Sequence, residues 1–129
     1  MFAHWFRAFP GRPEQVAEAR RFVAALLHGW ASVDDAVLVV SELAANAVNH
    51  TVSGAEGGRF LVSVNFSPDH VRIAVEDQGA PSIPCLKEVG MRDEGGRGLV
   101  LVSAYAKDWG VEPSPHGTAV WADFVRDPS

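Results

Sequence analysis

The sequence SELAANAVNH, running from Ser41 to His50, is the stretch from which the rest of the fold can be worked out. At about 100° per residue, Glu42, Asn46 and Asn49 share one stripe of a helix, about one turn apart. The opposite side predicts a core face made of Ala36, Val40, Leu43, Ala44, Ala47 and Val48. Because apolar residues also flank the polar stripe, we expect it to line a cavity. For such a stretch taken alone, a helix with three chance polar residues is the commoner arrangement.

The composition places the chain among soluble globular proteins. Its 129 residues fit one domain, residues 1–129, and are enough to bury a single core. Apolar residues make up 47% and charged residues 21%, which is ordinary for a folded domain. The net charge of -5, without a cluster of lysine and arginine, argues against a nucleic acid as the partner.

Cysteine usage and hydropathy bear on the compartment. The single cysteine, Cys85, cannot form an internal disulfide and has no Cys or His ligand pattern around it. The first ten residues lack the features of a signal peptide, and no apolar run is long enough to cross a bilayer. We therefore expect a cytoplasmic protein without membrane contact.

Hydrophobic periodicity predicts three helices and five strands. The helices are expected from Pro13 to the turn at Gly29, from a capping box at Ser32–Asp35 to about Val52, and from Gly98 to Ala106. The strands are expected at residues 4–9, 60–66, 71–76, 107–111 and 119–125, with turns at 67–70 and 113–117. This order predicts an α+β two-layer sandwich, a mainly antiparallel mixed sheet with helices on one face.

Residues 79–96 have no clear period and carry two prolines and two charged clusters. A loop of this length in so small a domain is usually functional, or else it marks an error in the assignment of elements.

The end of the second hairpin strand reads Glu76-Asp77-Gln78-Gly79. A carboxylate held in an apolar pocket at a strand end can accept a hydrogen bond from an exocyclic amine, which would select adenine over guanine. The glycine two residues later lets a ligand approach the backbone. The alternative is an ordinary Asx turn.

Two glycine-containing stretches follow the long loop. Gly95–Leu99 leads into the third helix, where free amides, the helix dipole and the charge of Arg97 suit a phosphate. The stretch is neither a P-loop nor a Rossmann turn, and a plain loop leading into a helix is the alternative. His116-Gly117-Thr118 begins the last strand, where a hairpin turn is the alternative.

Together, these stretches resemble the nucleotide-binding boxes of the GHKL ATPases. The matching motifs are Glu42-x-x-x-Asn46-Ala47-x-x-His50, Asp77-x-Gly79-x-Pro81, Gly96-Arg97-Gly98-Leu99 and Gly117-Thr118. Within that superfamily the motifs resemble those of the small bacterial anti-sigma-factor serine kinases and their actinobacterial ATP-binding relatives, and Trp109-Gly110 also resembles this branch. The resemblance extends from the first strand to Phe124.

The resemblance implies the Bergerat fold, with ATP and Mg²⁺ as ligands and residues 79–96 as the ATP lid. It implies that Asn46 holds Mg²⁺ and that Glu42 is the general base. Asn49 would lie near the phosphates, and His50 would be structural.

The same resemblance assigns the adenine and phosphate contacts. Asp77 would read the adenine amine with support from Thr118, and Gly79 would let the base pack against the backbone. The phosphates would contact the remaining box, made of Gly96, Arg97, Gly98 and Leu99.

The resemblance implies a serine/threonine protein kinase and anti-sigma factor that phosphorylates an anti-sigma-factor antagonist of the STAS type. A sigma factor as second partner and a homodimer through the first strand and helix rest on the same analogy. The alternative is a non-catalytic switch in which ATP sets the affinity for a partner that is sequestered without phosphotransfer. A third reading is an interaction domain that binds no nucleotide.

Overall fold

The computed structural model describes residues 3–51, 55–79, 100–115 and 117–126. The elements follow in the predicted order: β1 (Ala3–Pro10), α1 (Pro13–Leu26), α2 (Val33–His50), β2 (Arg59–Phe66), β3 (His70–Asp77), β4 (Asp108–Ser114) and β5 (Gly117–Val125). Residues 100–105 are also helical and belong to the third predicted helix.

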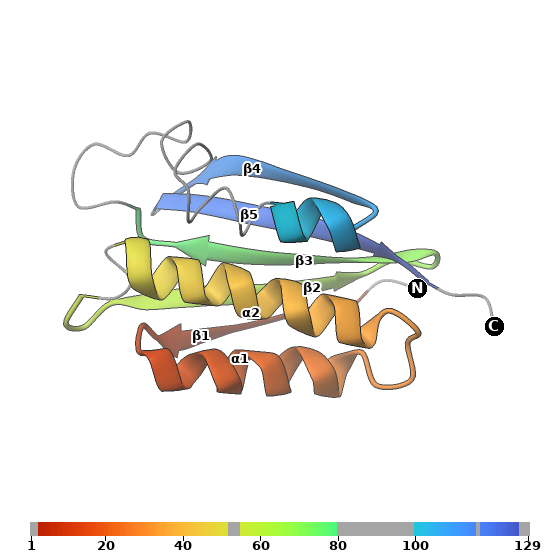
Figure 1. Ribbon diagram of the computed structural model, residues 1–129, viewed down its shortest axis with the longest axis horizontal. Helices are drawn as coiled ribbons and strands as arrows, with labels where there is room; N and C mark the ends of the chain where they lie inside the picture. The colour runs from red at the N-terminus through yellow and green to blue at the C-terminus, as the bar shows by residue number, and fades with distance from the viewer. Residues whose placement is uncertain (1–2, 52–54, 80–99, 116, 127–129) are drawn as a thin grey trace.

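The five strands form one sheet in the order β1-β2-β3-β5-β4, and each of the four pairings is antiparallel. The helices α1 and α2 and the helical residues 100–105 lie on the same face of this sheet (Figure 1). The predicted α+β two-layer sandwich is therefore confirmed. β3 lies in the middle of the sheet and packs directly against α2.

The core lies between the sheet and the two long helices. Alternating residues of β2 and β3 point into it, as the period of two predicts. Phe9 stacks on Phe60 with ring centroids 5.4 Å apart and meets Phe22 edge-on at 5.9 Å, so aromatic packing joins β1, β2 and α1. On the predicted core face of α2, Ala36, Val40, Leu43, Ala44 and Ala47 are buried and Val48 is partly buried, while Val39 beside this face is fully buried.

Helix α1 begins at Pro13, where a missing amide hydrogen costs nothing, and a turn with Gly29 at φ 90° follows it. Helix α2 begins at the predicted position, but the predicted capping box does not form. Ser32 makes no side-chain cap hydrogen bond, and its buried Oγ has no partner among the residues of the described ranges. The reason is the backbone at Ser32 (φ -86°, ψ 9°), which lacks the extended conformation of a capping residue.

The second hairpin is tighter than predicted. β4 continues to Ser114, which pairs with Gly117, so Pro113 lies within a strand opposite Thr118. A proline is tolerated there because β4 is an edge strand. Within the described part of the chain, no helix is long and apolar enough to cross a membrane.

Candidate functional site

The polar stripe of α2 lies at the border of the core. Glu42 and Asn46 are half-buried, whereas Asn49 is exposed. Over the described ranges, no hydrogen bond or ion pair engages the side chain of Glu42 or Asn46. A carboxylate and a carboxamide oxygen one turn apart on a helix are thus left open to a ligand, as hard oxygen donors.

Asp77 is the last residue of β3 and is half-buried. Its Oδ1 accepts hydrogen bonds from two backbone amides, Gly79 at 2.7 Å and Thr118 at 3.3 Å. Burial raises the pKa of this carboxyl, and the two amide hydrogen bonds oppose the rise. Among the residues with described positions, no donor bonds to Oδ2, so one carboxylate oxygen is fixed and the other is open to a ligand donor.

The Asx turn that was the alternative at this position is present, because the Gly79 amide bonds to the side chain two residues earlier. This turn occupies only one oxygen of Asp77, so it is compatible with the predicted site. The same oxygen also bonds to Thr118 on β5, which pairs with Asp77 in the sheet and is 5% exposed. The observed contact of Thr118 with Asp77 is made by its backbone amide.

Two glycines let the backbone approach this carboxylate closely. Gly79 has φ 85°, in the left-handed region that favours glycine. A Cβ on Gly117 would collide with the carbonyl oxygen of Asp77 and the nitrogen of Gly79. The close approach of β5 to the end of β3 therefore requires a glycine at position 117. Gly117 is part of the Gly117-Thr118 motif, but the motif alone does not indicate that it contacts Asp77.

The sequence also gave no sign of a bond between Gln78 and the start of β2. Gln78 Oε1 accepts a hydrogen bond of 2.9 Å from the backbone amide of Arg59. Only the pairing of β2 with β3 brings these residues together, since they are 19 positions apart in the chain.

The two halves of the predicted site lie at one end of the molecule. The carboxyl end of α2, the carboxyl end of β3 and the amino end of β5 lie on the same side, opposite the carboxyl end of α1 (Figure 1). Since α2 packs against β3, the fold brings the Glu42–Asn46 helix and the Asp77 strand end into neighbouring layers.

Several predicted site residues fall outside the described ranges: Gly96, Arg97, Gly98, Leu99 and the predicted lid beyond Gly79. The described ranges contain no group of three or more His, Cys, Asp or Glu side chains placed to hold a metal ion. This finding does not bear on the predicted Mg²⁺ ligand, Asn46, because its side chain is a carboxamide and asparagine is not among those four residue types.

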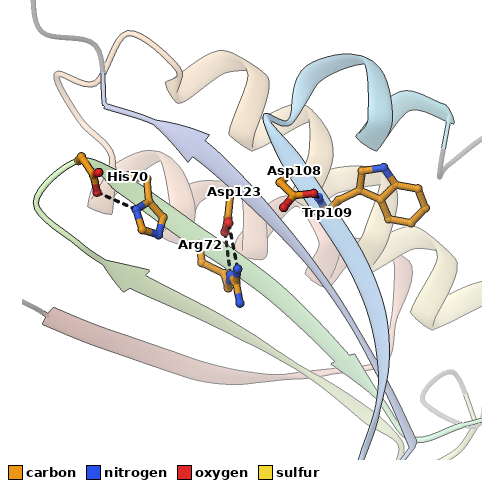
Figure 2. Close-up of polar contacts among 6 residues, drawn as sticks. His70, Arg72, Asp108, Trp109 and Asp123 are labelled. Atoms are coloured by element: carbon orange, nitrogen blue, oxygen red, sulfur yellow. Dashed lines mark hydrogen bonds and ion pairs between the residues drawn. The ribbon is translucent and has the colours of Figure 1, made fainter.

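A second carboxylate, Asp123 on β5, lies on the sheet face away from the helices (Figure 2). Arg72 on β3 donates hydrogen bonds to both carboxylate oxygens of Asp123, from Nε at 2.7 Å and from Nη2 at 2.9 Å. The Arg72 guanidinium also lies 3.9 Å from the ring centroid of Trp121, and its hydrogen bonds to Asp123 raise its pKa. This closed cluster joins β3 to β5 near the amino end of β3, away from Asp77 at its carboxyl end.

Comparison with known proteins identifies the family. Residues 9–124 match the family described as the histidine kinase-like ATPase domain. The chain belongs to this family. The histidine kinase-like ATPase is also similar to a protein named serine-protein kinase RsbW from Oceanobacillus iheyensis. The two are 29% identical over 114 residues, which cover 77% of this chain and 72% of the relative.

Both findings confirm the resemblance to the serine-kinase branch of the GHKL ATPases that the motifs predicted. An ATPase domain implies ATP as its ligand. The described residues are compatible with the adenine part of ATP, because the open oxygen of Asp77 can accept an amine hydrogen and the glycines at 79 and 117 keep the backbone close.

Proposed function

We propose that this histidine kinase-like ATPase is an ATP-dependent serine/threonine protein kinase and anti-sigma factor, acting on a STAS-type antagonist domain. The observation that supports nucleotide binding is that the two oxygens of the Asp77 carboxylate have different hydrogen-bonding states. One oxygen is fixed by two backbone amides, and the other accepts no bond within the described ranges. The similarity to a serine-protein kinase supports the choice of a serine as acceptor.

Asp77 selects adenine in this proposal. Its Oδ2 accepts a hydrogen from the exocyclic amine, whereas guanine presents a carbonyl oxygen there, which would repel a carboxylate. The amides of Gly79 and Thr118 hold the carboxylate in place before the nucleotide arrives, so little ordering is needed on binding.

Asn46 and Glu42 carry out the roles that depend on α2. Asn46 would hold Mg²⁺ through its amide oxygen, and the ion would neutralise charge on the phosphates. Glu42 lies one turn earlier on the same stripe and accepts the proton of the serine hydroxyl. The hydroxyl oxygen bonds to the γ-phosphorus as the bond to the leaving ADP breaks.

The phosphates are assigned to the second box. Arg97 and the amides around Gly96 and Gly98 steady the β- and γ-phosphates, Leu99 belongs to the same motif, and Asn49 approaches the phosphates from the last turn of α2. The exposure of Asn49 leaves its side chain accessible for this contact. The proposed partners are the antagonist domain and a sigma factor, with a homodimer as the working assembly.

The test is phosphotransfer from labelled ATP to a purified STAS-type antagonist domain, followed by mass spectrometry of the product. We expect one phosphoserine in the wild-type reaction and none with Glu42→Ala, while both proteins bind ATP with similar affinity. Asp34→Ala removes an exposed carboxylate in the first turn of the same helix, so it is the matched control and should transfer normally.

Equal transfer by Glu42→Ala would overturn the role given to Glu42. ATP-dependent binding of the antagonist without any phosphoserine would instead favour the non-catalytic switch.

A further inference from the structure

The β2–β3 ladder ends in an unusual way beside the adenine-reading carboxylate. The last registered pair is Leu61 with Glu76, and the same register would place Phe60 opposite Asp77 and then Arg59 opposite Gln78. No strand pairing continues there, yet the Arg59 amide remains satisfied, because the side-chain oxygen of Gln78 accepts its hydrogen at 2.9 Å. The Gln78 side chain thus takes the place of a strand carbonyl.

This side-chain bond lets the main chain after Asp77 turn away from β2 without leaving the Arg59 amide unpaired. An unpaired amide at the end of β2 would have to find another acceptor. With the side chain supplying that acceptor, the main chain of residues 77–79 is free to turn towards β5. There the Asp77 carbonyl and the Gly79 nitrogen lie against Gly117, and the Gly79 amide meets the Asp77 carboxylate.

The bond also joins the Asx turn at Asp77 to the start of β2. Arg59 begins β2, directly after the segment that leads from α2, and that segment is itself held by the bond from the Gly11 amide to the Gly58 carbonyl. Gln78 sits between Asp77 and Gly79, the residue whose amide aims the carboxylate. A shift of Gln78 away from β2 would therefore move both residues of the Asx turn.

We propose that Gln78 is a positioning residue for base selection: its bond to the Arg59 amide holds the Asp77 carboxylate where it reads the amine of adenine. This inference rests on the proposed adenine site. Gln78 acts through Asp77, so it governs discrimination between bases rather than the contacts that every nucleoside triphosphate shares.

The test compares the dissociation constants of ATP and inosine triphosphate, which differ at the base position that carries the amine. We expect the wild type to favour ATP. Gln78→Met keeps the length of the side chain but removes the acceptor, and we expect it to reduce this preference about three- to tenfold, mostly by weakening ATP. Gln78→Glu keeps an acceptor oxygen and should retain the preference; its added charge affects both triphosphates alike and cancels in the ratio.

Amide hydrogen exchange at Arg59, measured by NMR without nucleotide, reports on the bond directly. Exchange should be faster in Gln78→Met than in the wild type and slow in Gln78→Glu. Gln78→Ala serves as a second acceptor-free variant, and thermal unfolding checks that each variant is folded. A purely structural role would weaken both triphosphates equally and leave their ratio unchanged.

The outcomes separate the two ideas. A wild type that binds ATP and inosine triphosphate equally, or binds neither, would overturn the adenine site. A wild type that prefers ATP, with the same preference in Gln78→Met and Gln78→Ala, would overturn the role of Gln78 alone.

Discussion

Asp77 and Asp123 are two carboxylates on neighbouring strands of one sheet, and they have opposite hydrogen-bonding arrangements. Both oxygens of Asp123 accept bonds from Arg72, and the residue is only 8% exposed. Asp77 has one oxygen held by two amides, while the other accepts no bond within the described ranges. Both oxygens of Asp123 are therefore satisfied within the fold, whereas one oxygen of Asp77 can still accept a hydrogen bond from a ligand.

The difference shows how a structural charge can be told from a binding charge. A buried carboxylate is stabilised by a cation that uses both of its oxygens, as Arg72 does. Asp77 has only neutral amide donors, and burial raises its pKa. A fold that keeps such a group open accepts a cost in stability, which a ligand donor can offset when it binds.

The largest effect on nucleotide affinity is expected from a substitution at Asp77. In Asp77→Asn the amide oxygen can still accept from Gly79 and Thr118, but the open acceptor becomes an NH₂ donor that faces the adenine amine. We expect affinity for a non-hydrolysable ATP analogue with Mg²⁺ to fall about 100-fold, or about 2.8 kcal/mol, with the fold intact. Calorimetric titration measures the affinity and thermal unfolding the stability.

Asp123→Asn is the matched control, since it makes the same chemical change in the closed cluster. It should leave the affinity for the ATP analogue unchanged. Equal affinity in Asp77→Asn and the wild type would remove the distinction between the two carboxylates.

Two glycines test the same contrast through packing. A Cβ on Gly117 would collide with backbone atoms at Asp77 and Gly79, whereas one on Gly110 would lie 2.6 Å from the side-chain ring of Trp121. Both alanine variants should lose about 1–3 kcal/mol of unfolding free energy, because neither site has room. Only Gly117→Ala should also weaken nucleotide binding, about tenfold or more.

Denaturant unfolding and calorimetry of both glycine variants provide the comparison. A loss of affinity of the same size in Gly110→Ala would mean that packing around Trp121 is coupled to the nucleotide site, which would contradict the prediction.

Arg72→Ala probes the closed cluster from the cation side. It leaves the nearly buried Asp123 carboxylate without its partner and removes the guanidinium from the face of Trp121. Because Arg72 itself is partly exposed, we expect a moderate loss, about 1–2 kcal/mol of unfolding free energy. ATP affinity should stay within about twofold of the wild type. A loss of stability below about 0.3 kcal/mol would show that the ion pair is dispensable.

The smallest effect is a pH dependence of stability at Asp77. Its pKa is raised in the folded protein, so its contribution to stability is fully present below the unfolded pKa and is lost as pH rises through the folded pKa. Relative to Asp77→Asn, the wild type should therefore gain stability as the pH is lowered from 7 into the acidic range. Urea unfolding of both proteins at several pH values measures this difference, and a gap that is constant with pH would contradict it.

Local pattern was enough for much of the site. The spacing of Glu42 and Asn46 on a helix, and of Asp77 and Gly79 at a strand end, follows from periods of 3.6 and 2 that the sequence displays. Those periods also placed the core face of α2 and all the elements of the α+β fold. The capping box at Ser32 failed because the tight turn between α1 and α2, with bonds from Trp30 to Leu27 and from Val33 to Trp30, sets the backbone there.

By itself, then, the sequence determined the elements and most of their buried faces, and it singled out the groups that we propose contact the nucleotide. Only the tertiary structure decided their partners: Thr118 for Asp77, Arg72 for Asp123 and Arg59 for Gln78. Each of these contacts joins residues 19 to 51 positions apart, through the pairing of β3 with β2 on one side and with β5 on the other. Alternation along a strand fixes which face a side chain takes, but the neighbouring strand and its register depend on how the whole chain packs.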